Sequence, residues 1–158
     1  MKCLICLNLL YAISRLSSPI HCFNHYEVTK KIIERSKSFD YLFVVNDRHG
    51  INDKEFDILP KHCTTDIECS RLDMNFGHKA NWFDKKELDV FKSSHINLLL
   101  KNLNIDDIYL CGFVGCLDIL ESAKNRKVSV FKDSVGDLNM ATLCNTMYEL
   151  EKNGTVLI

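Results

Sequence analysis

The sequence has almost no net charge. Its 158 residues include 20 Lys and Arg against 21 Asp and Glu, which gives a formal charge of −1. Nucleic acids and anionic membranes attract proteins that carry an excess of positive charge, and this chain has none. We therefore expect neither a nucleic acid nor a membrane among its partners.

The sequence also lacks the cysteine spacing of a zinc module. It has eight cysteines, but the CxxC formed by Cys3 and Cys6 has no second CxxC to pair with. Cys3, Cys6 and Cys111 lie in apolar runs, where a free thiol packs as a small hydrophobic group. These features favour reduced thiols in a cytoplasmic protein over a disulfide framework.

No apolar run is long enough to cross a bilayer. Met1 and Lys2 are followed by an apolar stretch over residues 3–13, and residues 17–19 could serve as a cleavage region, as in a signal peptide. Asn8 interrupts this stretch and Arg15 follows it closely. We expect residues 1–18 to belong to the fold, with a signal peptide as the alternative.

The length and the ordinary composition, 46% hydrophobic and 26% charged, predict a single globular domain over residues 1–158. Apolar runs alternate with helical patterns, which is typical of an α/β fold with a doubly wound, mainly parallel sheet. Residues 46–75 are polar and should be largely irregular. The expected strands are 2–7, 41–45, 108–111, 127–131 and 155–158, and the expected helices are 26–38, 95–103, 117–125 and 140–151.

A candidate metal site follows the apolar run at 41–45. Asp47 and His49 are two positions apart, so on an extended backbone they point the same way. A carboxylate oxygen and an imidazole nitrogen suit a divalent metal such as Zn, Fe or Mn. Asp53 and His62 could complete the ligand set. Glu55 and Asp57 are alternatives to Asp53.

The segment 46–63 resembles the nicotinamidase branch of the isochorismatase-like cysteine hydrolases. That branch has a strand, D-x-H, a further His shortly before a Phe, and W-P-x-H-C; here Phe56 and Leu59-Pro60-Lys61-His62-Cys63 follow Asp47 and His49. The resemblance implies that Asp47, His49 and His62 are metal ligands and that Asp53 stands where the family has a His. It extends over nearly the whole chain and implies a Rossmann-like three-layer α/β/α sandwich.

The resemblance also assigns catalytic positions. Asn8 stands at the position of the family's catalytic Asp, and an amide cannot accept a proton from a thiol. Lys79 precedes Phe91 by the spacing that nicotinamidases have and so matches the catalytic Lys. Lys85 precedes Phe91 by the shorter spacing of the isochorismatase branch and ranks second. The resemblance leaves two candidates for the nucleophile. It is Cys116 if the loop is two residues shorter than in the family. Otherwise it is Asp118, which follows Gly112 by the six residues that separate the family's Gly and Cys.

The implied activity is hydrolysis of nicotinamide to nicotinate and ammonia, a step of pyridine nucleotide and NAD salvage. Its substrate would be a small carboxamide, and the protein could be a homo-oligomer. Ile13 and Leu59 stand where the family has aromatic residues around the substrate ring. The alternative is a pseudoenzyme of the same fold that acts in binding or assembly.

Overall fold

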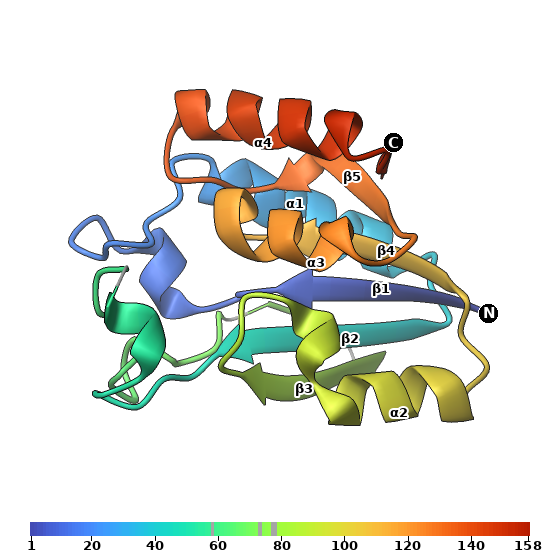
Figure 1. Ribbon diagram of the computed structural model, residues 1–158, viewed down its shortest axis with the longest axis horizontal. Coiled ribbons are helices and arrows are strands. Elements are labelled where there is room, and N and C mark those ends of the chain that lie inside the picture. The colour runs from blue at the N-terminus through green and yellow to red at the C-terminus, as the bar shows by residue number, and fades with distance from the viewer. Residues whose placement is uncertain (58, 73, 77–78) are drawn as a thin grey trace.

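One six-stranded parallel sheet forms the centre of the molecule (Figure 1). The computed structural model describes residues 1–57, 59–72, 74–76 and 79–158, with the side chain of Glu55 also left aside. The order of the strands is β3-β2-β1-β4-β5-β6. Their bounds are Lys2–Leu7 (β1), Tyr41–Asp47 (β2), Ala80–Lys85 (β3), Asp107–Gly112 (β4), Ser129–Val135 (β5) and Val156–Leu157 (β6).

Helices cover both faces of the sheet. The helix α1 (His25–Ser36) packs Val28 and Ile32 on one face. The helices α2 (Ser94–Asn102), α3 (Leu120–Lys124) and α4 (Met140–Lys152) contribute to the core on the other face. The predicted three-layer α/β/α sandwich is therefore confirmed. None of the described helices has the length and apolar character needed to cross a membrane.

The strand β1 lies between β2 and β4 at the middle of the sheet. Cys3, Ile5 and Leu7 enter one core cluster, and Leu4 and Cys6 enter the other. A strand buried on both faces needs the continuous apolar run seen at residues 2–7. This stretch, which also has features of a signal peptide, is the central strand of the sheet.

The edge strand β3 differs from the sequence-based expectation, which placed no strand at residues 80–85. Only one side of β3 pairs, with β2, and most of its side chains are half-buried or exposed. An edge strand of this kind lacks the apolar run of a buried one. Its carboxyl end brings Lys85 beside Asp47, with which it is paired in register.

Short turns complete the edge of the sheet toward which the strand arrows point in Figure 1. Two 3₁₀ turns, η1 (Tyr11–Ser14) and η2 (Lys54–Asp57), lie on that side. A further 3₁₀ turn, η4 (Val90–Lys92), precedes α2, and a π-helical turn, η5 (Gly115–Ile119), joins β4 to α3.

Candidate metal centre and catalytic site

The candidate site lies where the carboxyl ends of four neighbouring strands meet. Asn8 follows β1, Asp47 ends β2, Lys85 ends β3, and Asp118 lies in the turn after β4. Because β3, β2, β1 and β4 are adjacent in the sheet, these four residues lie side by side. Ligands of open α/β sheets bind at this edge. The topology thus gathers residues that are far apart in the sequence.

Asp47, His49 and His62 form a buried group whose ligand atoms all lie within 4.8 Å of one another. His49 Nε2 lies 4.0 Å from Asp47 Oδ1, and His62 Nε2 lies 3.9 Å from Asp47 Oδ2. One carboxylate and two imidazoles can hold Zn, Fe or Mn. Three of the four predicted ligands are therefore together.

The hydrogen bonds of the two histidines fix the orientation of their rings. His62 Nδ1 lies 2.7 Å from the carbonyl oxygen of Pro60, and His49 Nδ1 lies 3.2 Å from Asp53 Oδ2. A carbonyl or a carboxylate only accepts, so Nδ1 is the donor in both rings, which in a neutral imidazole leaves Nε2 as the nitrogen that can bind a metal. Metal-binding histidines have this arrangement. The residues present therefore fit a divalent cation.

Asp53 does not join this group of ligand atoms. Its Oδ2 also accepts the N–H of Gly50 at 2.9 Å, and its side chain is partly exposed. Of the two alternatives to Asp53, Asp57 is exposed on η2, and the side chain of Glu55 lies outside the described residues. Asp53 thus contacts a candidate ligand.

Lys85 is the lysine of the site. Its Nζ is hydrogen-bonded to both Asp47 Oδ1 and Asp118 Oδ1, and all three side chains are buried. Burial alone would lower the pKa of Lys85, but the two carboxylates outweigh it and hold the pKa above its usual value. The ammonium is therefore charged, and it joins the end of β2 to the turn after β4.

Lys79, which ranked first from the sequence, lies elsewhere. It precedes the amino end of β3, and with Lys37 and Phe76 it lines a different cavity. The structure therefore brings Lys85, the lysine that ranked second, next to Asp47 and Asp118, and places Lys79 apart from them. The signal that favours Lys85 was present in the sequence as its shorter spacing to Phe91.

The turn after β4 is sharply bent. Gly112 has φ +123°, and a Cβ there would lie 2.2 Å from the carbonyl oxygen of Leu7. Val114 has φ +59° and begins η5 in the left-handed region. Only glycine adopts the first of these conformations readily. The bend directs Asp118, and not Cys116, toward Lys85.

Cys116 faces a different carboxylate. Burial first, and then a hydrogen bond with Asp137, raise the pKa of its thiol well above the usual range. A thiol becomes a nucleophile when a nearby cation lowers its pKa. Cys116 has a carboxylate beside it instead of a cation. The ammonium of Lys85 is bound to Asp47 and Asp118.

Asp118 has the surroundings of an acid–base group. Burial raises its pKa most, Asp47 adds to this, and Lys85 and Asn8 oppose it, so that the pKa is about 7. A carboxyl group near neutrality can both accept and release a proton at working pH. Asp118 therefore has the protonation behaviour expected of a general base.

Asn8 has a structural position that depends on its small amide. It is fully buried with φ +58°, a conformation that Asn tolerates better than most residues. Its Oδ1 accepts the N–H of Asp47 at 3.0 Å. Its Nδ2 has no acceptor within hydrogen-bond distance among the described residues. Asn8 thus orients Asp47.

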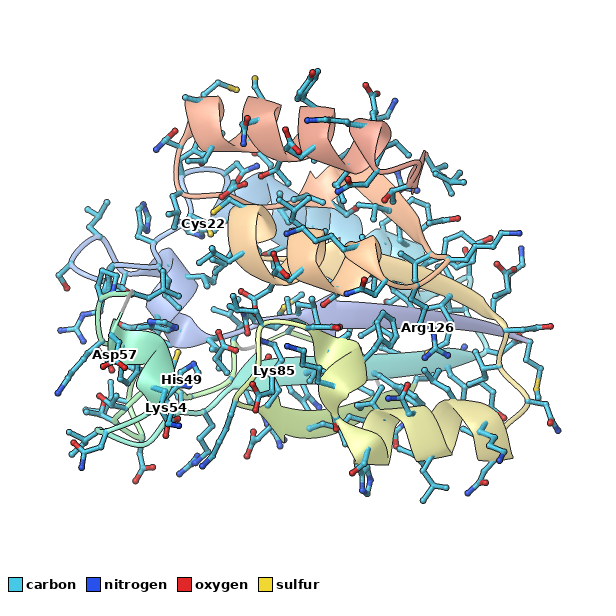
Figure 2. All side chains as sticks on the ribbon, in the orientation of Figure 1. Cys22, His49, Lys54, Asp57, Lys85 and Arg126 are labelled. Carbon is cyan, nitrogen blue, oxygen red and sulfur yellow. The ribbon has the colours of Figure 1, made fainter. Side chains whose placement is uncertain are left out.

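The backbone donors of η5 are largely used. Gly115 N donates to the carbonyl of Gly136 at 3.0 Å, and the N–H groups of Leu117 and Asp118 donate to that of Val114 at 3.0 and 2.9 Å. These are the groups that would form an oxyanion hole in a turn of this kind. A cavity of about 350 Å³ beside the carboxyl end of β3 is lined by residues that include Arg48, His49 and Lys85. Figure 2 shows His49 beside η2, and Lys85 near the carboxyl ends of β2 and β3.

Solved structures with the same fold cover the whole chain. They include the pyrazinamidase/nicotinamidase of Streptococcus mutans UA159 (TM-score 0.84, 18% identity, 100% of both chains). The pyrazinamidase of Pyrococcus horikoshii in complex with zinc has a TM-score of 0.84 at 14% identity and covers 99% of this chain and 98% of its own. PnC1 of L. infantum in complex with nicotinate has a TM-score of 0.83 at 17% identity and covers 100% of this chain and 92% of its own. No family model and no curated protein matches the sequence. The chain thus has the isochorismatase-like fold of the nicotinamidases.

Proposed function

We propose that this protein is an amidohydrolase of the nicotinamidase type, which converts nicotinamide, or a closely similar small carboxamide, to the carboxylate and ammonia. One observation carries the proposal: Lys85 contacts both Asp118 and Asp47, and Asp47 belongs to a group of three residues that fits a divalent metal. An acid–base carboxyl, a cation and a metal site therefore meet at one edge of the sheet. Proteins named as nicotinamidases have the same fold.

Asp118 acts as the general base. With a pKa of about 7, it is partly ionised at neutral pH and accepts a proton from the water that adds to the carboxamide carbon. The same proton then passes to the amide nitrogen as the C–N bond breaks. Ammonia leaves, Asp118 is ionised again, and the carboxylic acid that remains loses its own proton, to the ammonia or to water, and becomes the carboxylate.

Lys85 and Asn8 bind and orient the reacting group. The Lys85 ammonium lies beside Asp118 and stabilises the negative charge that develops on the carbonyl oxygen. Asn8 Nδ2, which has no hydrogen-bond acceptor among the described residues, would be a second donor. Asp47, His49 and His62 would hold the divalent cation, which supplies a Lewis acid that can bind the ring nitrogen of the substrate.

Cys116 is not the nucleophile in this proposal. An activated thiol requires a cation beside it, and Cys116 has Asp137 there. Asp118 has the spacing from Gly112 that the family gives to its Cys. The catalytic carboxylate has therefore moved from the end of β1 to the turn after β4.

The test is ammonia release from nicotinamide by the protein loaded with zinc or manganese. Wild type and Cys116→Ala should release ammonia at similar rates, and Asp118→Asn should be slower by about 10²–10⁴-fold, because it removes a proton-transfer group. Loss of activity in Cys116→Ala with retention in Asp118→Asn would reverse the assignment. No release from folded, metal-loaded wild type would refute the amidohydrolase.

A second candidate is a metal-binding pseudoenzyme of the same fold. It is favoured by the N–H groups of Gly115, Leu117 and Asp118, which already donate to carbonyls and so provide no oxyanion hole. Asp118 and Asp47 are also nearly inaccessible to solvent, at 1% and 3% exposure. This candidate predicts metal binding, with no ammonia from nicotinamide or other small carboxamides.

A further inference from the structure

We infer that Asp53 is a positioning residue that fixes the ring of His49 for metal binding and is not itself a ligand. The inference rests on the metal centre in the proposed function. It assigns to Asp53 a role different from that of the imidazole which the family has at this place. The first observation is the hydrogen bond from His49 Nδ1 to Asp53 Oδ2 at 3.2 Å.

The turn between His49 and Asp53 is built to hold this carboxylate. Asp53 N donates to the carbonyl of Gly50 at 3.1 Å, and Gly50 N donates back to Asp53 Oδ2 at 2.9 Å. A Cβ on residue 50 would lie 3.1 Å from Asp53 Oδ1, so a glycine leaves room for the carboxylate. Asp53 Oδ2 therefore accepts from both Gly50 N and His49 Nδ1, and the turn orients the carboxylate toward His49.

The second histidine has a different anchor for the same nitrogen. His62 Nδ1 donates to the carbonyl of Pro60 at 2.7 Å, which is a backbone group that no side-chain substitution removes. In both rings the anchored Nδ1 directs Nε2 toward Asp47. Only the anchor of His49 is a side chain, so only that half of the pair can be released by mutation.

The position of the Asp53 carboxylate also argues against a role as a ligand. The three ligand atoms that lie within 4.8 Å of one another come from Asp47, His49 and His62. Asp53 Oδ2 is engaged with Nδ1 of His49 and not with Nε2, and these two ring nitrogens point in different directions. A carboxylate in this place raises metal affinity by holding the ring in one tautomer and one orientation, which is typically worth about 10–100-fold.

The experiment is a Co²⁺ titration of the metal-free protein, followed by visible absorption, with Asp53→Ala and Asp53→Asn. We expect Asp53→Ala to weaken Co²⁺ binding by about 10–100-fold. Asp53→Asn should weaken it less, because its amide oxygen can still accept from Nδ1. Asp57→Ala and Asp57→Asn are matched controls, since Asp57 is an exposed carboxylate of the adjacent η2 turn (Figure 2), and they should bind Co²⁺ as wild type does.

A second measurement needs no metal. Two-bond ¹H–¹⁵N correlation spectra of histidine report which ring nitrogen carries the proton. We expect His49 to be protonated at Nδ1 in wild type and to show the Nε2-protonated tautomer in Asp53→Ala, with His62 unchanged in both. A purely structural role for Asp53 would leave the tautomer of His49 unaltered.

Three results would overturn the inference. They are wild-type Co²⁺ affinity in Asp53→Ala, an equal loss in the Asp57 variants, or Co²⁺ binding that survives in His62→Ala and so does not use this site. Because the readouts are affinity and tautomer, an absence of ammonia release would refute the proposed reaction and leave this inference standing.

Discussion

Replacement of Asp118 by Asn should change how the stability of the protein depends on pH. Asp118 is 1% exposed, and its pKa is about 7 against 3.8 for an ordinary Asp carboxyl. The folded protein therefore binds a proton that the unfolded chain has released between these two pH values. Stability falls with rising pH where the folded state binds more protons, so wild type loses stability as the pH rises from about 3.8 to about 7.

The size of this loss follows from the shift. One pKa unit corresponds to about 1.4 kcal/mol, so between pH 5 and pH 8 the contribution of Asp118 falls by about 3 kcal/mol. Asn does not titrate, and Asp118→Asn should lack this loss. The free energy of unfolding of wild type minus that of Asp118→Asn should thus decrease by about 3 kcal/mol between the two pH values.

The assay is urea unfolding of metal-free wild type and Asp118→Asn at pH 5 and pH 8, followed by circular dichroism. Asp57→Asn is the matched control, because it removes a carboxyl that is exposed, and its difference from wild type in the free energy of unfolding should change far less between the two pH values. The reasoning about Asp118 would be refuted if the free energy of unfolding of wild type minus that of Asp118→Asn were the same at both pH values, or were larger at pH 8.

Two further predictions concern the same edge of the sheet. The double variant Asn8→Asp, Asp118→Cys has the residue types that the resemblance gives to the nicotinamidase branch at these positions. Its ammonia release from nicotinamide should exceed that of Asp118→Cys alone by about 10²–10⁴-fold and be blocked by iodoacetamide. Equal rates in the two variants would show that the turn does not position a nucleophile. Gly112→Ala should lower the free energy of unfolding by about 3 kcal/mol or more in urea, since its Cβ would lie 2.2 Å from the carbonyl oxygen of Leu7. Gly154→Ala is the matched control at φ +77°, with nothing within 4 Å of the added Cβ, and should cost only about 1 kcal/mol.

Most of the fold could be predicted from the sequence because its central strands are buried on both faces. The apolar runs that became β1 and β4 are unmistakable, and the alternation with helices indicates a parallel sheet. The strand β3 could not be predicted, because Asn81, Trp82 and Asp84 alternate in no regular apolar pattern on an edge strand. Lys79 ranked ahead of Lys85 because its spacing to Phe91 is the one seen in nicotinamidases.

The candidate site was predictable where residue type alone decides the chemistry. Asp47, His49 and His62 are ligand types in a recognisable order, and the structure brings them together. The partner of Asp53 was not predictable, since a carboxylate four residues after a histidine can face the ring or the metal, and only the turn at Gly50 decides between them. The sequence likewise left Cys116 and Asp118 open, because the bend at Gly112 determines which of them faces Lys85.

The ion cluster around Lys85 restricts the order in which its members can be exchanged over evolutionary time. A buried ammonium without enough carboxylate around it costs several kcal/mol, and a surplus of buried carboxylates costs a comparable amount. A lineage that began with Asp at position 8 and Cys at position 118 would reach the present pair through an intermediate with either one carboxylate too few or one too many beside Lys85. Each such intermediate is less stable than either end point, so the two replacements are coupled. A return to the thiol arrangement would pass through the same less stable intermediates.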